Sequence, residues 1–560
     1  MHRFAYQISS RLRLLCLVVV LLPAIVACSG PGDEDAAPTA TPAPAATLTP
    51  EPTPETNPTN QQSAATATPE QAAAPTPTRE LPLTPSLKPT LVATPQPDQS
   101  APVEATPWLP EERPADQLVE LPDLDLHYAV HVSELSVASG YVLASEVVTI
   151  REFRSFVPDV LYFQIPAAGY GFFTLHSVTL DGAPVEPGWL NNGATMVLDL
   201  PEGVAAPVEI GIDFQLDVGG PEADGWGYLA VDADVLRLGY WFPLISDDHP
   251  FSVTLDPSYT RVAEFDITLD LDAGLEFSHS GEVTGSEQLD DSRVRYYLHG
   301  ENIRDFDFAV SPSYRFASAY SATGVFIEYA WRADSPDVSA QVLATTAEAV
   351  DRLSALLGPY PWPSLRVADG GPALPGGIEY GTFIWINPYY DPLDRLIYHE
   401  VAHMWLYGII GTRTLDEGWI DEGGAEFFER GLASDFTELA PYPAGGYCCW
   451  LDSRWEELPQ SGTGTYFAIY EQGQRFYMAV LEAMGWDAFW TAMQQIYADF
   501  ALDIVTGYDM LRTWQAHSPV DLRPLYHEYF RYPWIDDLPP PGMTDQQGWL
   551  AVSPETSSGE

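Results

Sequence analysis

A long proline-rich segment separates the N-terminus of this chain from every stretch that could form a core. Residues 31–114 contain 20 of the 51 prolines and a single aromatic residue, Trp108. Such a segment cannot bury enough apolar surface to offset the entropy that ordering would cost, so we expect it to stay extended and solvated. Proline-rich spacers are semi-rigid. The sequence therefore predicts a disordered tether over residues 28–115 and folded structure from about residue 116.

The first residues have the character of a secretion signal. Arg3, Arg11 and Arg13 precede an apolar run, Leu14 to Val26, that is too short to span a bilayer. The run ends in Ile25-Val26-Ala27-Cys28, which resembles a bacterial lipoprotein signal. That resemblance implies cleavage after residue 27, acylation of Cys28 and a location on the extracytoplasmic face of the cell envelope. The alternative is an ordinary signal peptide with a chance cysteine.

Charge and residue usage exclude several functions. With 79 acidic and 25 basic side chains the formal net charge is −54, so nucleic acid is a poor partner. The single lysine, Lys88, lies in the proline-rich segment, which excludes Schiff-base chemistry and a lysine-bearing phosphate loop in a folded site. Cys448 and Cys449 are adjacent, which favours two free thiols over a strained disulfide, although their oxidation state stays open.

The periodicity of the apolar residues changes once along the folded part. Residues 116–315 show short alternating runs broken by turn residues, which predicts an all-β domain. Residues 316–538 add helical spacing, and residues 539–560 look like a loose tail. The α+β reading rests on strands expected at Tyr141–Ile150, Val160–Ile165, Phe172–Leu180, Thr195–Leu200, Phe265–Leu271 and Tyr380–Ile386, and on helices expected at Ala340–Leu357, Pro392–Tyr407, Asp421–Leu432 and Tyr466–Met484.

The chemistry centres on the helix expected at Pro392–Tyr407, with Asp391 as its N-cap. It contains His399-Glu400-Val401-Ala402-His403. A spacing of four residues puts both imidazoles on one helical face, one turn apart, where they can bind a single metal ion. Glu400 is then able to reach a metal-bound water. After eighteen intervening residues comes Glu422, and two histidines plus one glutamate are a known ligand set for a zinc site with an open position.

This pattern resembles the gluzincin aminopeptidases of the membrane alanyl aminopeptidase family (peptidase family M-one). Glu422 lies within Trp419-Ile420-Asp421-Glu422-Gly423-Gly424-Ala425, similar to that family's W-[LI]-x-E-G-x-A. Further segments agree in order and rough spacing: Gly358-Pro359-Tyr360-Pro361-Trp362-Pro363, Gly376-Gly377-Ile378-Glu379-Tyr380 (the family's G-x-M-E-N), Tyr470-Glu471-Gln472-Gly473 (its Y-E-x-G), Asp521-Leu522-Arg523-Pro524 and Tyr240-Trp241-Phe242-Pro243.

The resemblance implies a saddle-like β domain followed by a thermolysin-like catalytic domain, and one zinc ion per chain held by His399, His403 and Glu422. It implies Glu400 as general base and Tyr470 as a donor to the oxyanion. Glu379, with Gly376 and Gly377 beside it, would bind the free amine of a peptide substrate. The expected function is thus a membrane-tethered zinc aminopeptidase that acts on peptides with a free N-terminus.

Several alternatives stay open from the sequence. Tyr470 can be a core residue, Glu379 a solvated carboxylate, and Glu426 and Glu429 a solvated helix face rather than partners of the ligands. Ile378 and Tyr380 replace the Met and Asn of the family signature, which can alter the first specificity pocket. The long helical C-terminal domain of many family members is not expected here, so the site should be more open. An endopeptidase, another amide or epoxide hydrolase, and a non-catalytic binding protein remain competing functions.

Overall fold

The computed structural model of the chain describes residues 121–221, 227–248, 259–436, 450–454, 458 and 467–542, all of which belong to one compact unit, Ala105–Glu560. The predicted signal peptide with Cys28, the proline-rich tether, Cys448, Cys449 and most of the C-terminal tail lie outside these residues. In the part of the chain that is described, no helix has the length and apolar character needed to cross a bilayer.

The N-terminal half is built on a large sheet whose strands alternate buried and solvent-facing residues, as period-two patterning predicts. Its eight strands run in the order β14-β15-β12-β1-β2-β8-β4-β5, with β1 and β12 parallel and the other pairs antiparallel. Their bounds are β1 Leu124–Ser136, β2 Tyr141–Phe153, β4 Phe173–Leu180, β5 Ala183–Pro184, β8 Val208–Asp217, β12 Ala263–Asp272, β14 Glu282–Asp290 and β15 Arg293–Ile303.

Two four-stranded sheets complete this half. One has the order β13-β16-β10-β9 and the other β11-β3-β7-β6. The strands are β3 Val160–Gln164, β6 Gly188–Leu190, β7 Thr195–Asp199, β9 Leu229–Asp232, β10 Val235–Leu238, β11 Leu244–Ser246, β13 Glu276–His279 and β16 Phe308–Ser311, with a short helix α1 at Pro166–Gly169.

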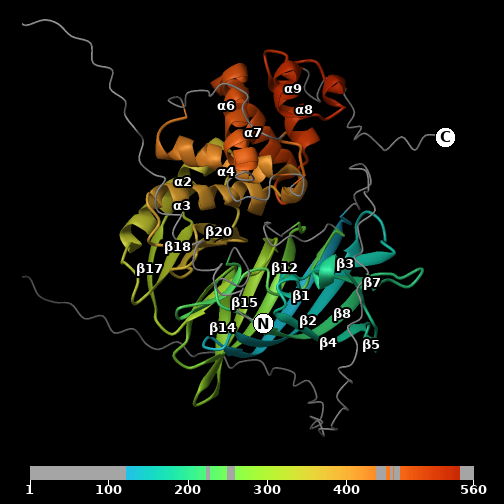
Figure 1. Cartoon of the computed structure of the whole chain (residues 1–560), viewed down its shortest axis with the longest axis vertical. Coiled ribbons are helices and arrows are strands. Elements are labelled where there is room, and N and C mark those ends of the chain that lie inside the picture. The colour runs from blue at the N-terminus through green and yellow to red at the C-terminus, as the bar shows by residue number, and fades with distance from the viewer. Residues whose placement is uncertain are drawn as a thin grey trace, which may run out of the picture. The chain divides into compact units, whose positions relative to one another are not determined.

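The second half combines a five-stranded sheet with helices (Figure 1). The sheet has the order β17-β18-β19-β21-β20. Helices α2 and α3 contact this sheet, and α4 lies against α3. The strands are β17 Tyr314–Tyr320, β18 Phe326–Arg332, β19 Ser364–Asp369, β20 Gly377–Tyr380 and β21 Phe383–Ile386; the helices are α2 Ser339–Leu356, α3 Leu393–His403, α4 Thr414–Ala433, α6 Gln472–Met484, α7 Trp486–Phe500, α8 Gly507–His517 and α9 Arg523–Tyr529, with π-helical turns at Met404–Ile409 and Phe467–Glu471. The α+β prediction is confirmed.

Three details of the prediction are wrong. The strand expected at Tyr380–Ile386 is a hairpin, β20 and β21, that turns at Gly381 and Thr382. The helix expected to begin at Asp421 begins at Thr414 and has a non-helical residue at Glu417. Helix α3 has Pro392, not Asp391, as its N-cap, and no side chain caps it.

Arg304 joins the large sheet's half of the fold to the helix that carries the histidines. Its buried guanidinium donates to four backbone carbonyls: those of Tyr407 (2.6 Å) and Ile409 (3.3 Å) at the end of the π-helical turn after α3, and those of Thr260 (2.8 Å) and Asp503 (2.7 Å). The Ile409 and Asp503 carbonyls also accept from the backbone N–H groups of Leu502 and Gly411, so Arg304 adds a second donor to these two. The two halves therefore share one polar cluster.

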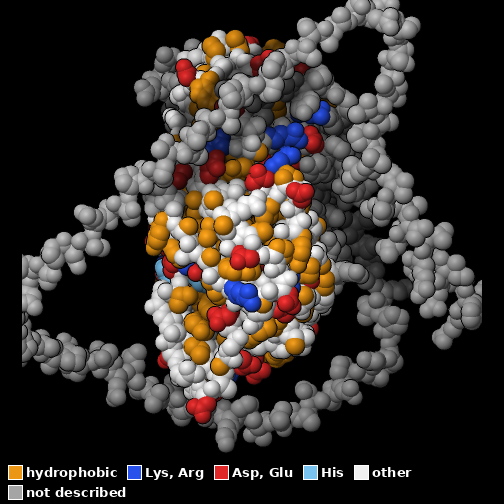
Figure 2. Space-filling model, turned by 90° about the vertical axis from the view of Figure 1, so that its left-hand side faces the viewer, with side chains coloured by type: hydrophobic (Ala, Val, Ile, Leu, Met, Phe, Trp, Pro, Cys, Tyr) orange, Lys and Arg blue, Asp and Glu red, His pale blue; other side chains and the backbone are white. Residues whose placement is uncertain are grey.

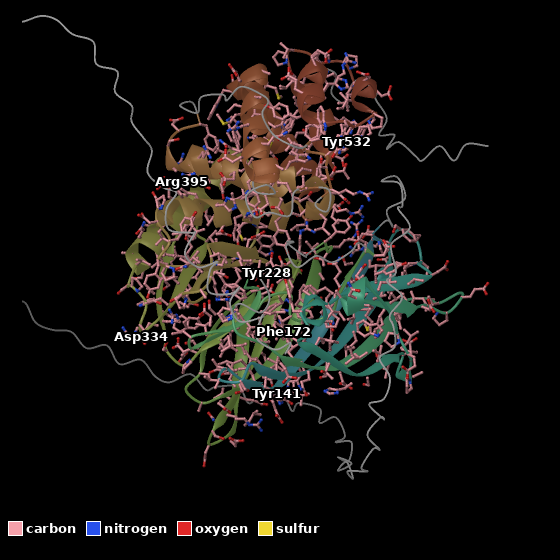
Figure 3. The ribbon with its side chains drawn as sticks, viewed as in Figure 1. Tyr141, Phe172, Tyr228, Asp334, Arg395 and Tyr532 are labelled. Atoms are coloured by element: carbon pink, nitrogen blue, oxygen red, sulfur yellow. The ribbon has the colours of Figure 1, made fainter. Side chains whose placement is uncertain are left out.

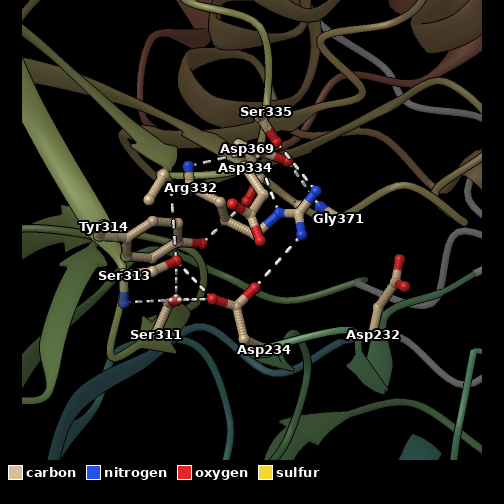
Figure 4. A network of polar contacts seen from close by, with 12 residues as sticks. Asp232, Asp234, Ser311, Ser313, Tyr314, Arg332, Asp334, Ser335, Asp369 and Gly371 are labelled. Carbon is tan, nitrogen blue, oxygen red and sulfur yellow. Dashed lines mark hydrogen bonds and ion pairs between the residues drawn. The ribbon is translucent and has the colours of Figure 1, made fainter.

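A second arginine joins the five-stranded sheet to the sheet of β9, β10, β13 and β16 (Figure 4). Arg332 on β18 lies 3.2 Å from Asp234, which stands between β9 and β10, and 3.2 Å from Asp369 at the end of β19. The Tyr314 hydroxyl donates to the Asp369 carbonyl at 2.8 Å. Removing one partner of such a buried pair leaves an uncompensated charge, so this cluster fixes the angle between the two sheets.

Glu146 is an acidic residue at a core-facing position of β2. Its side chain points into the apolar core of the large sheet, where it is 1% exposed, and neither carboxylate oxygen has a hydrogen-bond partner among the described residues. Burial raises the pKa of Glu146 well above its ordinary value. The side chain therefore stays protonated in the folded state at pH values at which the unfolded chain loses the proton.

This burial predicts that Glu146→Gln gains stability over the natural protein as pH rises. Above about pH 4.5 only the unfolded state ionises Glu146, so the natural protein loses up to about 1.4 kcal/mol per pH unit, whereas glutamine does not titrate. Urea unfolding at about pH 5 and about pH 8 measures the difference between the two proteins. A difference that does not change with pH would contradict the buried, protonated state.

Candidate metal centre

The three predicted metal ligands converge on one point between α3 and α4. His399 Nε2 lies 3.1 Å from His403 Nε2 and 3.3 Å from Glu422 Oε2, and His403 Nε2 lies 3.4 Å from the same oxygen. Ligands about 2.05 Å from a tetrahedral zinc ion are about 3.3 Å apart. The three atoms therefore have the spacing that a zinc ion requires, although each comes from a separate turn of helix.

Each histidine also has a carboxylate of α4 at its other nitrogen. His403 Nδ1 lies 2.6 Å from Asp421 Oδ1, and the Thr414 hydroxyl donates to the other oxygen of Asp421 at 2.8 Å. His399 Nδ1 lies 3.5 Å from Glu429 Oε2. An Nδ1–H that donates to a carboxylate leaves Nε2 with its lone pair, which is the form that binds metal.

Glu429 is buried and ion-paired with Arg395, which lies on α3 one turn before His399 (Figure 3). The prediction of a solvated face for Glu426 and Glu429 is therefore wrong, since both are buried. The sequence analysis assigned no role to Asp421, Thr414 or Arg395. The sequence feature that could have identified Asp421 is its position directly before Glu422, on the part of α4 that faces α3.

The electrostatics of this cluster favour a cation. Burial opposes protonation of His403, but Asp421 and Glu422 outweigh it and raise its pKa to about 10. Burial likewise opposes ionisation of Glu422, yet the two imidazoles lower the pKa of Glu422 to about 2. The carboxylates thus stabilise positive charge at the imidazole pair, and a divalent ion supplies that charge.

Two more carboxylates lie beside the ligands. Glu379 on β20 and Glu400 on α3 are both buried, and Glu379 Oε1 is 3.7 Å from His403 Nδ1. Oxygens of these two residues and a nitrogen of His403 lie within 4.8 Å of one another. The alternative of a solvated Glu379 is therefore wrong.

The glycines before Glu379 differ in what they do. A side chain at Gly377 would meet the Glu400 carboxylate, so glycine lets β20 pass close to α3 without displacing Glu400. At Gly376 the same carbon would meet only Leu396, at 3.7 Å, and nothing in the structure requires glycine there.

The residues that replace the family's Met and Asn lie in an apolar cluster rather than beside the carboxylates. Ile378 and Tyr380 are buried with Tyr240 and Trp385, and the Tyr380 ring lies 5.1 Å from the Tyr240 ring. Because side chains alternate along a strand, Glu379 between them points to the other side.

Tyr470 faces the ligands from the π-helical turn before α6. Its hydroxyl donates to Glu422 Oε1, and its ring lies nearly parallel to that of His399, with centroids 6.1 Å apart. A side chain at Gly423 would come within 2.7 Å of the Gly473 backbone, so these two glycines allow α4 and α6 to touch. The alternative in which Tyr470 serves only the core is wrong, since the side chain is half-buried and its hydroxyl contacts a ligand.

Comparison with known proteins points to one fold. A two-domain M1 zinc metallopeptidase mutant bound to L-arginine has a TM-score of 0.56 and 16% identity, covering 76% of this chain and 96% of that one. An M1 zinc metallopeptidase mutant from Deinococcus radiodurans bound to a Tyr-Ser-Ala substrate has the same TM-score and identity, covering 70% and 90%. The fold is that of the M1 zinc metallopeptidases.

Curated relatives match over shorter stretches, and no family model matches. Leucine aminopeptidase 2 of Ajellomyces capsulatus is 23% identical over 275 residues, 46% of this chain and 43% of that protein. Leucine aminopeptidase 2 of Aspergillus clavatus is 27% identical over 104 residues, 18% and 17%. The chain thus spans less than half the length of these relatives.

The carboxylate behind His403 leads to a prediction about zinc affinity. Asp421→Ala should weaken zinc binding by roughly 10- to 100-fold, because His403 loses the group that fixes its tautomer and ring orientation. Competition with a chromogenic chelator measures the affinity. Ser518→Ala, a buried polar change far along the chain, is the control. An unchanged affinity in Asp421→Ala would mean that this hydrogen bond does not orient the ligand.

Proposed function

We propose that this chain is a zinc aminopeptidase of the extracytoplasmic bacterial cell envelope that removes N-terminal residues from peptides. The observation that carries the proposal is the triangle of His399 Nε2, His403 Nε2 and Glu422 Oε2, whose sides of 3.1–3.4 Å fit a zinc ion. We propose one catalytic zinc ion per chain at this triangle, where it would supply Lewis-acid activation of water and of the scissile carbonyl.

The neighbouring side chains have the chemistry that peptide hydrolysis needs. Glu400 is proposed to accept a proton from the attacking water and to pass it to the leaving nitrogen. The Tyr470 hydroxyl, which donates to Glu422 here, is proposed to donate to the developing oxyanion when substrate is present. These roles match those implied by the motifs in the sequence.

The carboxylates beside the two histidines favour a substrate with a free amine. Glu379 and Glu400 are buried there, and Glu379 Oε1 lies 3.7 Å from His403 Nδ1. An α-ammonium group of a bound peptide would pair with the Glu379 carboxylate, and such an ion pair makes an enzyme select the N-terminus. The place of Glu379 therefore favours the aminopeptidase over an endopeptidase.

The comparisons support the same substrate class. The curated relatives are named leucine aminopeptidases, and the neighbours of known structure are described as bound to the tripeptide Tyr-Ser-Ala or to L-arginine. The membrane tether is a separate part of the proposal. It rests on the sequence alone, through the apolar run before Cys28 and the proline-rich segment after it.

The molecular face shown in Figure 2 is consistent with peptides as the proposed partners. Its few basic side chains lie beside acidic ones, in keeping with 25 basic against 79 acidic residues in the chain. A face of this kind lacks the cluster of Lys and Arg side chains that binding a phosphate backbone requires. Peptides, rather than nucleic acid, are therefore the proposed partners.

The first test compares zinc-loaded protein with Glu400→Gln on aminoacyl amides that release a fluorophore. We expect chelator-sensitive cleavage by the natural protein and a loss of about 10²-fold or more in the variant, because its amide cannot accept the proton. Zinc content measured in the same samples should be equal. Full activity in Glu400→Gln would exclude this mechanism, and zinc binding without cleavage of any peptide would favour a binding protein.

The second test separates the aminopeptidase from an endopeptidase. Glu379→Ala should lose most of its preference for aminoacyl amides over their N-acetyl counterparts, seen as a rise in KM for the free-amine series, because the ammonium loses its partner. Glu276→Ala, at an exposed carboxylate on β13, is the matched control. Equal cleavage of free and acetylated substrates by the natural protein would favour an endopeptidase or another amide hydrolase.

A further inference from the structure

A second group of metal-binding side chains lies on the outer face of the eight-stranded sheet. His127 Nε2 is 2.9 Å from Asp266 Oδ2, and His299 Nδ1 is 2.9 Å from Asp266 Oδ1. Glu264 joins this group, since one oxygen of Glu264, one of Asp266 and a nitrogen of His127 lie within 4.8 Å of one another. Arg151 Nη1 lies 2.5 Å from Glu264 Oε2, so an ion would displace this arginine or bind through the other oxygen of Glu264. No spacing typical of metal ligands connects these histidines along the chain.

The sheet, rather than the chain spacing, brings these residues together. β1, β12 and β15 are neighbouring strands, and in their register His127 is opposite Glu264 and Asp266 is opposite His299 (Figure 1). Side chains two residues apart on a strand share a face, so all four residues point outward. Three hydrogen-bonded strands hold the four side chains in place before any ligand arrives.

A similar group, four residues away on each of the three strands, has an arginine in place of the second histidine. His131 Nε2 lies 3.2 Å from Asp270 Oδ2, but the third position is Arg295, whose guanidinium donates to both oxygens of Asp270 at 2.6 and 2.8 Å. A guanidinium has no lone pair to offer a metal. Asp270 is buried under this arginine, whereas the Asp266 side chain is 54% exposed and within reach of an ion from solvent.

We propose that His127, Glu264 and Asp266, with His299 on the second oxygen of Asp266, form a second metal site that binds a divalent first-row transition ion such as Zn²⁺ or Ni²⁺. An imidazole together with carboxylate oxygens suits these ions better than Mg²⁺ or Ca²⁺, which prefer oxygen ligands alone. Bound there, the ion replaces the protons that otherwise join the imidazoles to Asp266 and links three strands of the sheet. Its role is structural and independent of the proposed peptidase activity.

Calorimetric titration with Ni²⁺ at about pH 7.5 tests the site, on the full chain loaded with one equivalent of zinc so that the second site is not filled beforehand. The natural protein should bind one Ni²⁺. His127→Asn should weaken binding by about tenfold or more because it removes the imidazole ligand, and His299→Asn should weaken binding because Asp266 loses the group that orients it. His131→Asn is the matched control. His131 lies with Asp270 and Arg295 in the same strand geometry, so its replacement should leave the titration unchanged. Aminopeptidase activity should be the same in all four proteins.

Two results would overturn the proposal. One is the absence of saturable Ni²⁺ binding up to about 100 µM, the range in which a site of this kind should fill. The other is equal binding by the natural protein, His127→Asn and His299→Asn. Melting curves recorded with and without Ni²⁺ check that the variants fold, and a Ni²⁺-dependent rise in Tm lost only in those two variants would add independent support.

Discussion

The hydrogen bond between His403 and Asp421 couples the helix that carries the histidines to the helix that carries the third ligand. α4 contributes Glu422 to the ligand triangle and also the carboxylates behind both imidazoles, Asp421 and Glu429. Neither helix can shift along the other without breaking these contacts together. The glycines at 423 and 473 then bring α6 against α4, and with it the tyrosine that faces the ligands. The geometry of the site is therefore a property of helix packing.

The carboxylates around the two histidines set the demand for positive charge in this part of the fold. Buried negative charges are costly unless cations or hydrogen bonds offset them. Arg395 and Arg430, two of the few basic residues of the chain, lie beside Glu429 and Glu426. Further carboxylates lie next to the imidazoles, where a metal ion and a substrate ammonium would add positive charge.

The metal ligands could be predicted from sequence because a four-residue helical spacing fixes their relation locally. The burial of Glu429 could not, since it depends on how α3 and α4 pack. The turn of the β20–β21 hairpin also depends on distant contacts: the Gly381 N–H donates to Asp305 and the Gly281 N–H to the Thr382 hydroxyl. The start of α4 at Thr414 was also missed, because the backbone is non-helical at Glu417, before the predicted start. Gly423 and Gly424 lie inside the predicted range, where they clear Gly473 and Leu406. Likewise, no spacing along the chain connects His127 with His299, because β pairing does so.

Arg304 bears on how such a chain can be divided or recombined. The carbonyls that end the histidine-bearing helical segment are satisfied by a side chain that belongs to the β half. A fragment cut between β16 and β17 would take the ligands but lose the guanidinium that donates to those carbonyls, although the Leu502 N–H would still donate to Ile409. The end of the histidine-bearing helical segment would then have to rearrange before the ligands could hold a metal. A domain that is transferred to another protein with this site intact must therefore include Arg304.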